Sequence, residues 1–144
     1  MLRFAWLSFR EQLYAAVHEA GYTELQSAHV LLFRYPTIEG MRPGELAEQS
    51  NLSKQAVNDL LRQLEAWGYL TLEPDRRDRR AKRIALTSRG QALMDAMFDA
   101  AHEVAAEWAD RVGRDRFDAF RATLADLNQL DGIQEGAARP LPES

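Results

Sequence analysis

The fold is decided by one stretch of the chain, Asp78-Arg79-Arg80-Ala81-Lys82-Arg83-Ile84-Ala85-Leu86-Thr87. It begins with clustered charge and continues as an alternating polar and apolar pattern, which is typical of a β-strand. An amphipathic helix ending at Trp67-Gly68 and a first alternating segment come before it. A helix, a strand, an arginine-rich loop and a second strand, in that order, predict a winged helix-turn-helix, an architecture suited to DNA.

The hairpin is predicted from two alternating segments, 69–73 and 82–87, each with two large aliphatic residues on one face. Four of the seven residues at 75–81 are arginines. We therefore expect a β-hairpin with a long charged loop, which we call the wing (residues 69–87).

Two helices are predicted directly before the wing. Pro43 suits the first position of a short helix at 43–49, where its missing N–H costs nothing. Ser53 suits the N-cap of a second helix that reaches Trp67, and Gly68 suits the position after its end. The apolar face of this second helix consists of Val57, Leu60, Leu61 and Leu64.

Helical periodicity accounts for most of the remaining chain. Apolar residues recur at helical spacing before Gly21, and a second helix is predicted over about 24–35, ending before Pro36. A long helix is predicted from Ser88 to a break at Gly113, followed by a last helix. The predicted fold class is mainly α with a small β-hairpin wing: a winged helix-turn-helix core flanked by N- and C-terminal helices.

The length of 144 residues fits one domain with its own core. We expect that domain to span 1–131, divided into a winged-helix lobe at 36–90, a recognition helix at 53–67, the wing at 69–87, and dimerisation helices at 1–20 and 88–131. The tail at 132–144 is rich in Gly, Ala, Pro and Glu, and we expect it to be mobile.

Composition excludes several classes of protein. The chain has no cysteine, which rules out disulfides, cysteine zinc sites and a cysteine nucleophile. Its apolar start lacks the pattern of a signal peptide, and nowhere do eighteen apolar residues run together, so we expect no membrane partner. These features are typical of a cytoplasmic protein, and DNA binding would associate it with the nucleoid.

The net charge of -4 hides an uneven distribution. Residues 41–90 contain ten Lys/Arg and seven Asp/Glu, a net of +3, whereas the remainder contains eight and fifteen, a net of -7. Because steering of a polyanion depends on local potential, this split is compatible with binding nucleic acid.

The predicted recognition helix carries polar residues opposite its apolar face. Gln and Asn can bind adenine through N6 and N7, Lys can reach guanine or a phosphate, and Ser can contact a phosphate. The candidates for DNA binding here are Ser53, Lys54, Gln55, Asn58 and Arg62. Taken alone, they also fit an ordinary solvated helix face.

The wing offers a second, independent set of candidates: Arg76, Arg77, Asp78, Arg79 and Arg80. Asp75 and Asp78 cannot neutralise four arginines, and a loop of like charge repels itself unless a polyanion offsets it. Arginine is also favoured in narrow minor grooves. The alternative is a hairpin tip kept soluble by its charge.

At these positions the chain resembles the multiple-antibiotic-resistance regulator (MarR) family. The resemblance is carried by Gly44-Glu45-Leu46-Ala47, by Leu52-Ser53 with Val57 and Leu64-Glu65, by Gly68-Tyr69-Leu70, and by Asp78 to Thr87 with Gly90. An Asp-Arg-Arg followed by Leu-Thr and then Gly is specific in this context. The resemblance extends over nearly the whole chain and is weakest in the first twenty and last fifteen residues.

The resemblance implies a homodimeric winged-helix transcription factor, usually a repressor, that binds a palindromic operator of double-stranded DNA. Many members release DNA when a small aromatic or phenolic effector binds. The resemblance also implies that Arg79 enters the minor groove, while Asp78 and Arg80 brace the wing and meet the backbone.

Three residues depart from the family pattern. Asp59 stands where arginine is frequent, and Arg62 where an acid is frequent. Asp59 would either accept a hydrogen bond from cytosine N4 or pair with Arg62 across one helical turn. Arg42 stands where a Thr or Ser cap is common, so we expect an ionic phosphate contact there.

The terminal helices carry more aromatic surface than one winged-helix core needs, which favours a dimer interface. The predicted interface residues are Phe4, Trp6, Phe9, Trp108, Phe117, Phe120 and Leu124. The alternative is that these helices simply pack on their own core.

An effector pocket, if present, would lie between the two parts of the chain. The candidate residues are Tyr14, Tyr22, His29, Phe33, Tyr35 and Trp67. The same aromatic residues would also serve to fill that junction.

Catalytic and cofactor motifs are absent from the sequence. The three histidines, His18, His29 and His102, show no metal-ligand spacing, and no phosphate-binding loop or nucleophile elbow occurs. We therefore expect no enzyme activity, metal or cofactor. The alternative function is a winged-helix module that binds a basic protein partner instead of DNA, which Asp59 and the acidic net charge favour.

Overall fold

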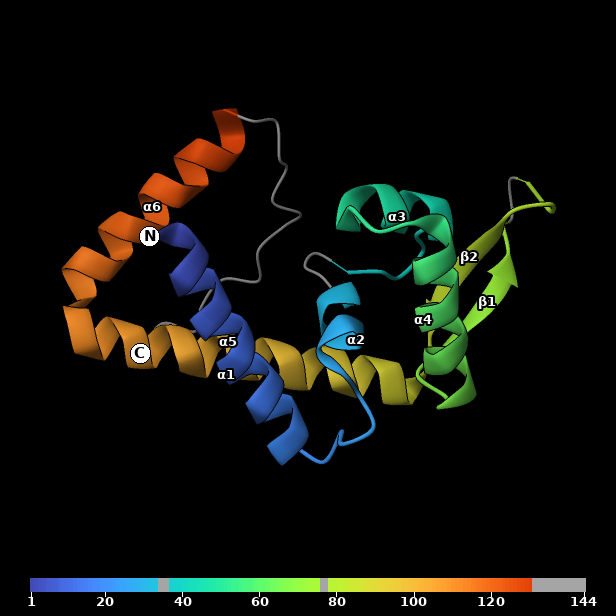
Figure 1. Ribbon diagram of the computed structural model, residues 1–144, viewed down its shortest axis with the longest axis horizontal. Coiled ribbons are helices and arrows are strands. Elements are labelled where there is room, and N and C mark those ends of the chain that lie inside the picture. The colour runs from blue at the N-terminus through green and yellow to red at the C-terminus, as the bar shows by residue number, and fades with distance from the viewer. Residues whose placement is uncertain (34–36, 76–77, 131–144) are drawn as a thin grey trace.

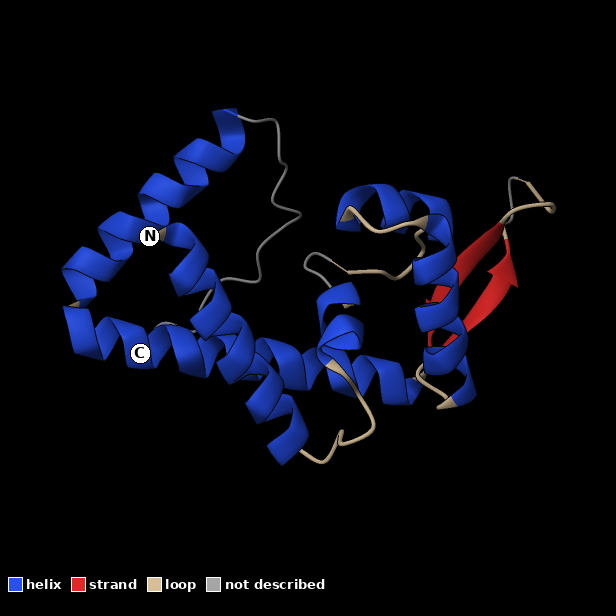
Figure 2. Cartoon of the chain, in the orientation of Figure 1, coloured by secondary structure: helices blue, strands red, loops and turns tan. Residues whose placement is uncertain are grey.

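The computed structural model describes residues 1–33, 37–75 and 78–130 of the chain (Figure 1). Six helices and one two-stranded antiparallel hairpin make up these residues (Figure 2). In chain order they are α1 (Leu2–Glu19), α2 (Ser27–Leu32), α3 (Pro43–Ser50), α4 (Lys54–Ala66), β1 (Leu70–Pro74), β2 (Lys82–Leu86), α5 (Ser88–Val112) and α6 (Arg114–Leu130). The predicted fold class is confirmed.

The elements form two ends joined by α5. Figure 1 shows α3, α4 and the hairpin at one end of the long helix α5, with the wing tip projecting away from the rest. At the other end α6 turns back from α5, and the N-terminus lies beside it. Helix α1 crosses α5, so the chain's two terminal segments share the end opposite the wing.

Local sequence signals set most of the helix ends. Pro43 begins α3, and the Ser53 hydroxyl caps α4 by accepting a hydrogen bond from the Ala56 N–H at 3.1 Å. Gly21 and Gly68 follow α1 and α4 with positive φ angles of 100° and 78°, the left-handed conformation that ends a helix. Gly113 separates α5 from α6 as predicted.

The prediction for the second helix was wrong at both ends, because α2 spans only Ser27–Leu32. Tyr69 and Arg89, which lie far along the chain, bind the Glu24 carboxylate. These contacts hold the residues before Ser27 in a turn. The helix begins only where the Gln26 N–H donates to Nδ1 of His29, at 3.0 Å. A long-range contact therefore overrides the local helical pattern.

The core lies between the helix-turn-helix, the hairpin and the first half of α5. Val57, Leu61 and Leu64 of α4 are fully buried, as the periodicity predicted. Leu70 pairs with Leu86 and Leu72 with Ile84 across the hairpin, so the aliphatic residues share one face. In the described part of the chain, no helix is long and apolar enough to cross a membrane.

Candidate nucleic-acid interface

Helices α3 and α4 are held in a fixed relation by their connecting turn. The Arg42 N–H donates to the Glu45 carboxylate at 2.8 Å, which fixes the start of α3. Asn51 ends α3 in the left-handed conformation, at φ 54°, so the chain turns sharply before Ser53 starts α4. The buried face of α4 then sets which of its residues face the solvent.

The exposed surface of α4 and its N-cap includes the residues that the sequence singled out. Ser53, Lys54, Gln55 and Asn58 are exposed, and the Arg62 side chain is 72% exposed. Arg62 pairs with Asp59 at 3.2 Å, which confirms the predicted contact across one helical turn. An exposed pair of this kind contributes little stability, so both side chains stay available to a ligand.

The wing tip is closed by hydrogen bonds at its base and braced by Asp78. The Asp75 N–H donates to the Ala81 carbonyl at 2.8 Å, where the two strands leave the sheet. The Asp78 carboxylate accepts a hydrogen bond from the Arg80 N–H at 3.1 Å. The backbone carbonyl of Asp78 accepts one from the Ala81 N–H. Asp78 therefore stabilises the described part of the wing tip.

Two of the wing arginines are presented to solvent. Arg79 and Arg80 are exposed, and neither forms an ion pair with another described residue. Arg76 and Arg77 lie outside the described residues. The tip therefore offers at least two cationic side chains that the rest of the described chain does not neutralise.

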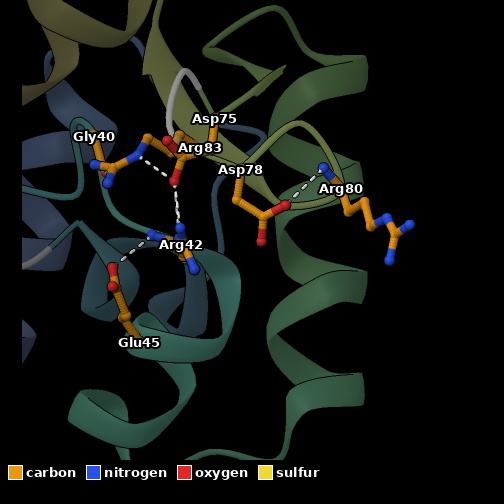
Figure 3. A network of polar contacts seen from close by, with 7 residues as sticks. All are labelled: Gly40, Arg42, Glu45, Asp75, Asp78, Arg80 and Arg83. Carbon is orange, nitrogen blue, oxygen red and sulfur yellow. Dashed lines mark hydrogen bonds and ion pairs between the residues drawn. The ribbon is translucent and has the colours of Figure 1, made fainter.

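By its place in the sequence, Asp75 is one of the charges of the wing loop. Its side chain instead faces the body of the lobe. Its side chain is 1% exposed and accepts from Nε and Nη2 of Arg42 at 2.9 and 2.6 Å and from Nε of Arg83 at 2.8 Å (Figure 3). Arg42, the expected phosphate contact, thus places its guanidinium on this carboxylate. The hydrogen bonds that Arg42 donates to Asp75 raise the pKa of Arg42. The negative charges of Asp75, Asp78 and Glu45 also raise it, whereas desolvation lowers it.

The segment before α3 is joined to β2 by backbone hydrogen bonds. The Gly40 N–H donates to the Ile84 carbonyl at 2.8 Å, and the Ile84 N–H donates to the Met41 carbonyl at 2.9 Å. Nη1 of Arg83 donates to the Gly40 carbonyl at 2.6 Å (Figure 3). The wing and the start of the helix-turn-helix are therefore one connected unit.

A second polar cluster joins the lobe to α5. The buried Tyr69 hydroxyl donates to Glu24 at 2.5 Å, and Glu24 also pairs with Arg89, whose guanidinium lies 4.4 Å from the centre of the Tyr69 ring. Burial, followed by the Glu24 contact, raises the pKa of Tyr69. The Tyr69 hydrogen bond is the main cause that lowers the pKa of Glu24. Sequence reasoning missed this cluster, because its members lie up to 65 positions apart.

The Leu-Thr…Gly part of the wing signature has a packing role at the start of α5. The Thr87 hydroxyl accepts from the Gly90 N–H at 3.1 Å and donates to the Gly68 carbonyl at 2.6 Å. A Cβ at Gly90 would lie 1.9 Å from the Tyr69 carbonyl oxygen. Only glycine therefore allows α5 to approach the start of the hairpin this closely.

Residues 23–81 match the model of the MarR family, the segment that contains the helix-turn-helix and most of the wing. Over this segment the chain is similar to the MarR family. A crystal structure of MarR aligns with a TM-score of 0.75 and 22% identity over 90% of this chain and 87% of that chain. These two comparisons confirm both the resemblance and the winged-helix fold.

Two further proteins that this chain resembles have named functions. It is 27% identical over 128 residues to the transcriptional activatory protein BadR of Rhodopseudomonas palustris, covering 85% of this chain and 72% of the relative. The solved structure of the transcriptional repressor CouR bound to a 23-mer DNA duplex aligns with a TM-score of 0.65 and 25% identity, over 88% of each chain. The chain is thus similar to MarR-family transcriptional regulators and shares their winged-helix fold.

The described residues predicted for an effector pocket pack against other rings of their own chain. His29 is fully buried, and the centre of its ring lies 5.0 Å from that of Trp67. The ring centres of Phe33 and Tyr22 lie 6.5 and 6.1 Å from that of Tyr69. Tyr14 lies 4.5 Å from His18, and Tyr35 is outside the described residues. These positions fit the alternative interpretation, in which the rings fill the junction.

His29 was not recognised in the sequence as a core residue. Its Nδ1 accepts from Gln26, so Nε2 carries the proton and donates to Oε1 of Gln63 at 3.1 Å. Burial lowers the pKa of His29, although these two hydrogen bonds oppose the shift. The described residues contain no group of three or more His, Cys, Asp or Glu that could hold a metal.

All the predicted interface residues except Phe4 line two adjoining grooves between α1, α5 and α6, with volumes of about 420 and 360 Å³. Phe4 is 72% exposed, Trp6 51% and Phe120 39%, while Phe9 packs edge-on against Trp108. Leu124 also lines the second groove. Phe117 differs from the others, because at 9% exposure it forms a floor that its own chain covers.

Proposed function

We propose that this chain is a MarR-family regulator that binds a palindromic operator as a homodimer, with α4 in the major groove and the wing in the adjacent minor groove. The observation that carries the proposal is that one lobe presents two exposed surfaces: the polar face of α4, and Arg79 and Arg80 of the wing tip, which form no ion pair with a described residue. The residues at 41–90 carry a net charge of +3, so this lobe attracts DNA although the whole chain is acidic.

Each exposed residue has a proposed contact. Gln55 and Asn58 would bind base edges, Ser53 and Lys54 would contact phosphates or guanine, and Arg62 would reach a base or phosphate beyond them. In the wing, Arg79 would enter the minor groove while Arg80 meets the backbone. Arg76 and Arg77 are carried into this proposal from the sequence alone.

The proposed dimer interface consists of the grooves of α1, α5 and α6. Their exposed aromatic residues are costly in water, and a second copy of the chain would cover them. Two-fold symmetry would then place the two copies of α4 about one DNA turn apart, as a palindrome requires.

We propose repression as the output, with release by a small aromatic or phenolic effector. The CouR relative is named a repressor and the BadR relative an activator, so the direction requires a transcription assay with purified polymerase. Loss of transcript on adding the regulator supports repression, and a gain contradicts it. Effector release predicts that phenylacetate or phenol raises the melting temperature and weakens DNA binding; unchanged values for both exclude these probes as effectors.

The deciding experiment is binding of the purified chain to a labelled duplex from upstream of its own gene, and to duplexes enriched from a random library. Each titration is repeated at two salt concentrations with unrelated competitor DNA. We expect binding that survives competitor and weakens steeply with salt, because phosphate contacts release counterions. An enriched palindrome supports the dimer, whereas failure to enrich any sequence favours the protein-interaction module.

A further inference from the structure

The Asp75 cluster brings two cations from different segments onto one buried carboxylate. Arg42 precedes α3, Arg83 lies on β2, and both bind the same oxygen of Asp75 (Figure 3). The carboxylate is 1% exposed, whereas the two arginine side chains are 36% and 39% exposed. The buried acid thus holds two guanidinium groups that remain within reach of solvent.

Each of these arginines already uses two of its guanidinium donor groups inside the protein. A guanidinium recognises phosphate best through two parallel N–H donors on one edge. Arg42 uses its Nε and Nη2 on Asp75, and Arg83 uses Nε on Asp75 and Nη1 on the Gly40 carbonyl. Arg79 and Arg80, by contrast, form no ion pair with any described residue.

We propose that Asp75 is a positioning residue that withholds Arg42 and Arg83 from sequence-independent phosphate binding, and so raises the regulator's selectivity for its operator. The inference rests on the proposed DNA binding. Phosphate contacts strengthen binding to every sequence alike, so two additional free arginines beside α3 and the wing would favour unrelated DNA most. Holding them on an internal acid keeps the discriminating contacts on α4.

The test compares Asp75→Asn with the wild type on the enriched duplex and on a scrambled duplex of equal composition, over a salt series. The variant removes the charge that binds both arginines. We expect tighter binding to scrambled DNA, a salt slope steeper by about one to two units, and a specificity ratio lowered by roughly tenfold. A purely structural role predicts weaker binding to both duplexes with no steeper slope, which would overturn the proposal.

Glu48→Gln is the matched control. Glu48 is exposed on α3 of the same lobe, forms no ion pair with a described residue, and its replacement changes the net charge by the same amount. We expect it to keep the wild-type salt slope. A slope as steep as that of Asp75→Asn would show that net charge alone is responsible and would contradict the proposal.

Arg83→Gln addresses the same question if Asp75→Asn does not fold, because Arg42 still pairs with Asp75. If Arg83 is withheld from phosphate, this variant keeps the wild-type salt slope, whereas a slope lower by about one unit would identify a phosphate contact and overturn the proposal. Circular dichroism confirms that each variant is folded. Absence of salt-dependent DNA binding by the wild type would instead refute the proposed function itself.

Discussion

The two ends of this molecule treat their apolar residues in opposite ways. In the winged-helix lobe, Leu46, Val57 and Ile84 are at most 1% exposed, and the buried Asp75 is paired. At the far end, Phe4 and Trp6 are more than half exposed. The lobe completes its core within one chain, whereas the terminal helices leave a surface that burial against a partner would stabilise.

The winged-helix lobe carries the proposed DNA contacts, and the far end carries the proposed dimer interface. Leaving apolar surface in water costs about 25 cal/mol per Å². The exposed grooves therefore carry a free-energy cost, which a second chain covering them would remove. The lobe carries the residues proposed to contact DNA on a core that is complete within one chain. Variants at each end are therefore expected to fail in different ways.

The largest effect is expected from Trp6→Asp, which places a charge in the exposed groove. We expect the dimer to dissociate at micromolar concentration and operator affinity to fall by at least about 100-fold, because two linked half-sites bind far more tightly than one. Light scattering measures the mass, and fluorescence anisotropy measures the binding.

Ala15→Asp is the control for Trp6→Asp, because it adds the same charge to an exposed position of α1 that lines neither groove. It should remain dimeric. A wild-type chain that is monomeric, or a Trp6→Asp chain that stays dimeric, would contradict the proposed interface.

The next largest effect is expected inside the lobe, from Gly90→Ala. The added Cβ would meet the Tyr69 carbonyl oxygen, so we expect the free energy of unfolding to fall by about 3 kcal/mol and the melting temperature by roughly 10 °C. Gly44→Ala is the matched control, since a Cβ there meets nothing within 4 Å. Equal melting temperatures for the two variants would show that α5 does not pack on the hairpin as described.

Arg79→Ala tests recognition without disturbing either core. Arg79 is exposed, so the fold and the dimer should be unchanged. Loss of a minor-groove contact should weaken operator binding by about 1–3 kcal/mol, or roughly 5- to 150-fold. Arg114→Ala removes the same charge at the far end and should bind normally. Wild-type affinity in Arg79→Ala would contradict the placement of the wing.

The smallest effect is expected from pH. Burial holds the pKa of His29 below its usual value of about 6.5, so the unfolded chain binds a proton more readily than the folded one. Stability should therefore fall as the pH drops below about 6.5. His29→Gln should reduce this fall between about pH 7 and pH 5.5, as followed by thermal melting, whereas His102→Gln should not. Parallel melting curves for wild type and His29→Gln would contradict a neutral buried His29.

The sequence by itself determined the elements and their order. Pro43, Ser53 and Gly68 act through the backbone of their immediate neighbours, so their effect on helix ends is independent of the rest of the fold. Periodicity likewise identified the buried face of α4 and, with it, the exposed face that carries Gln55 and Asn58.

Only the tertiary structure decided which polar residues are occupied and which are free. Asp75 and Arg83 look like members of a uniformly charged wing, yet burial of the carboxylate turns one acid and two arginines into an internal cluster. Glu24 binds Tyr69 and Arg89, and this shortens α2. His29 lies in the core. Neither feature was predicted from the sequence. Apart from Asp75 and Arg83 on the same hairpin, the partners in these ion pairs and hydrogen bonds lie 33 to 65 positions apart, and no local pattern encodes contacts that form only when the chain folds.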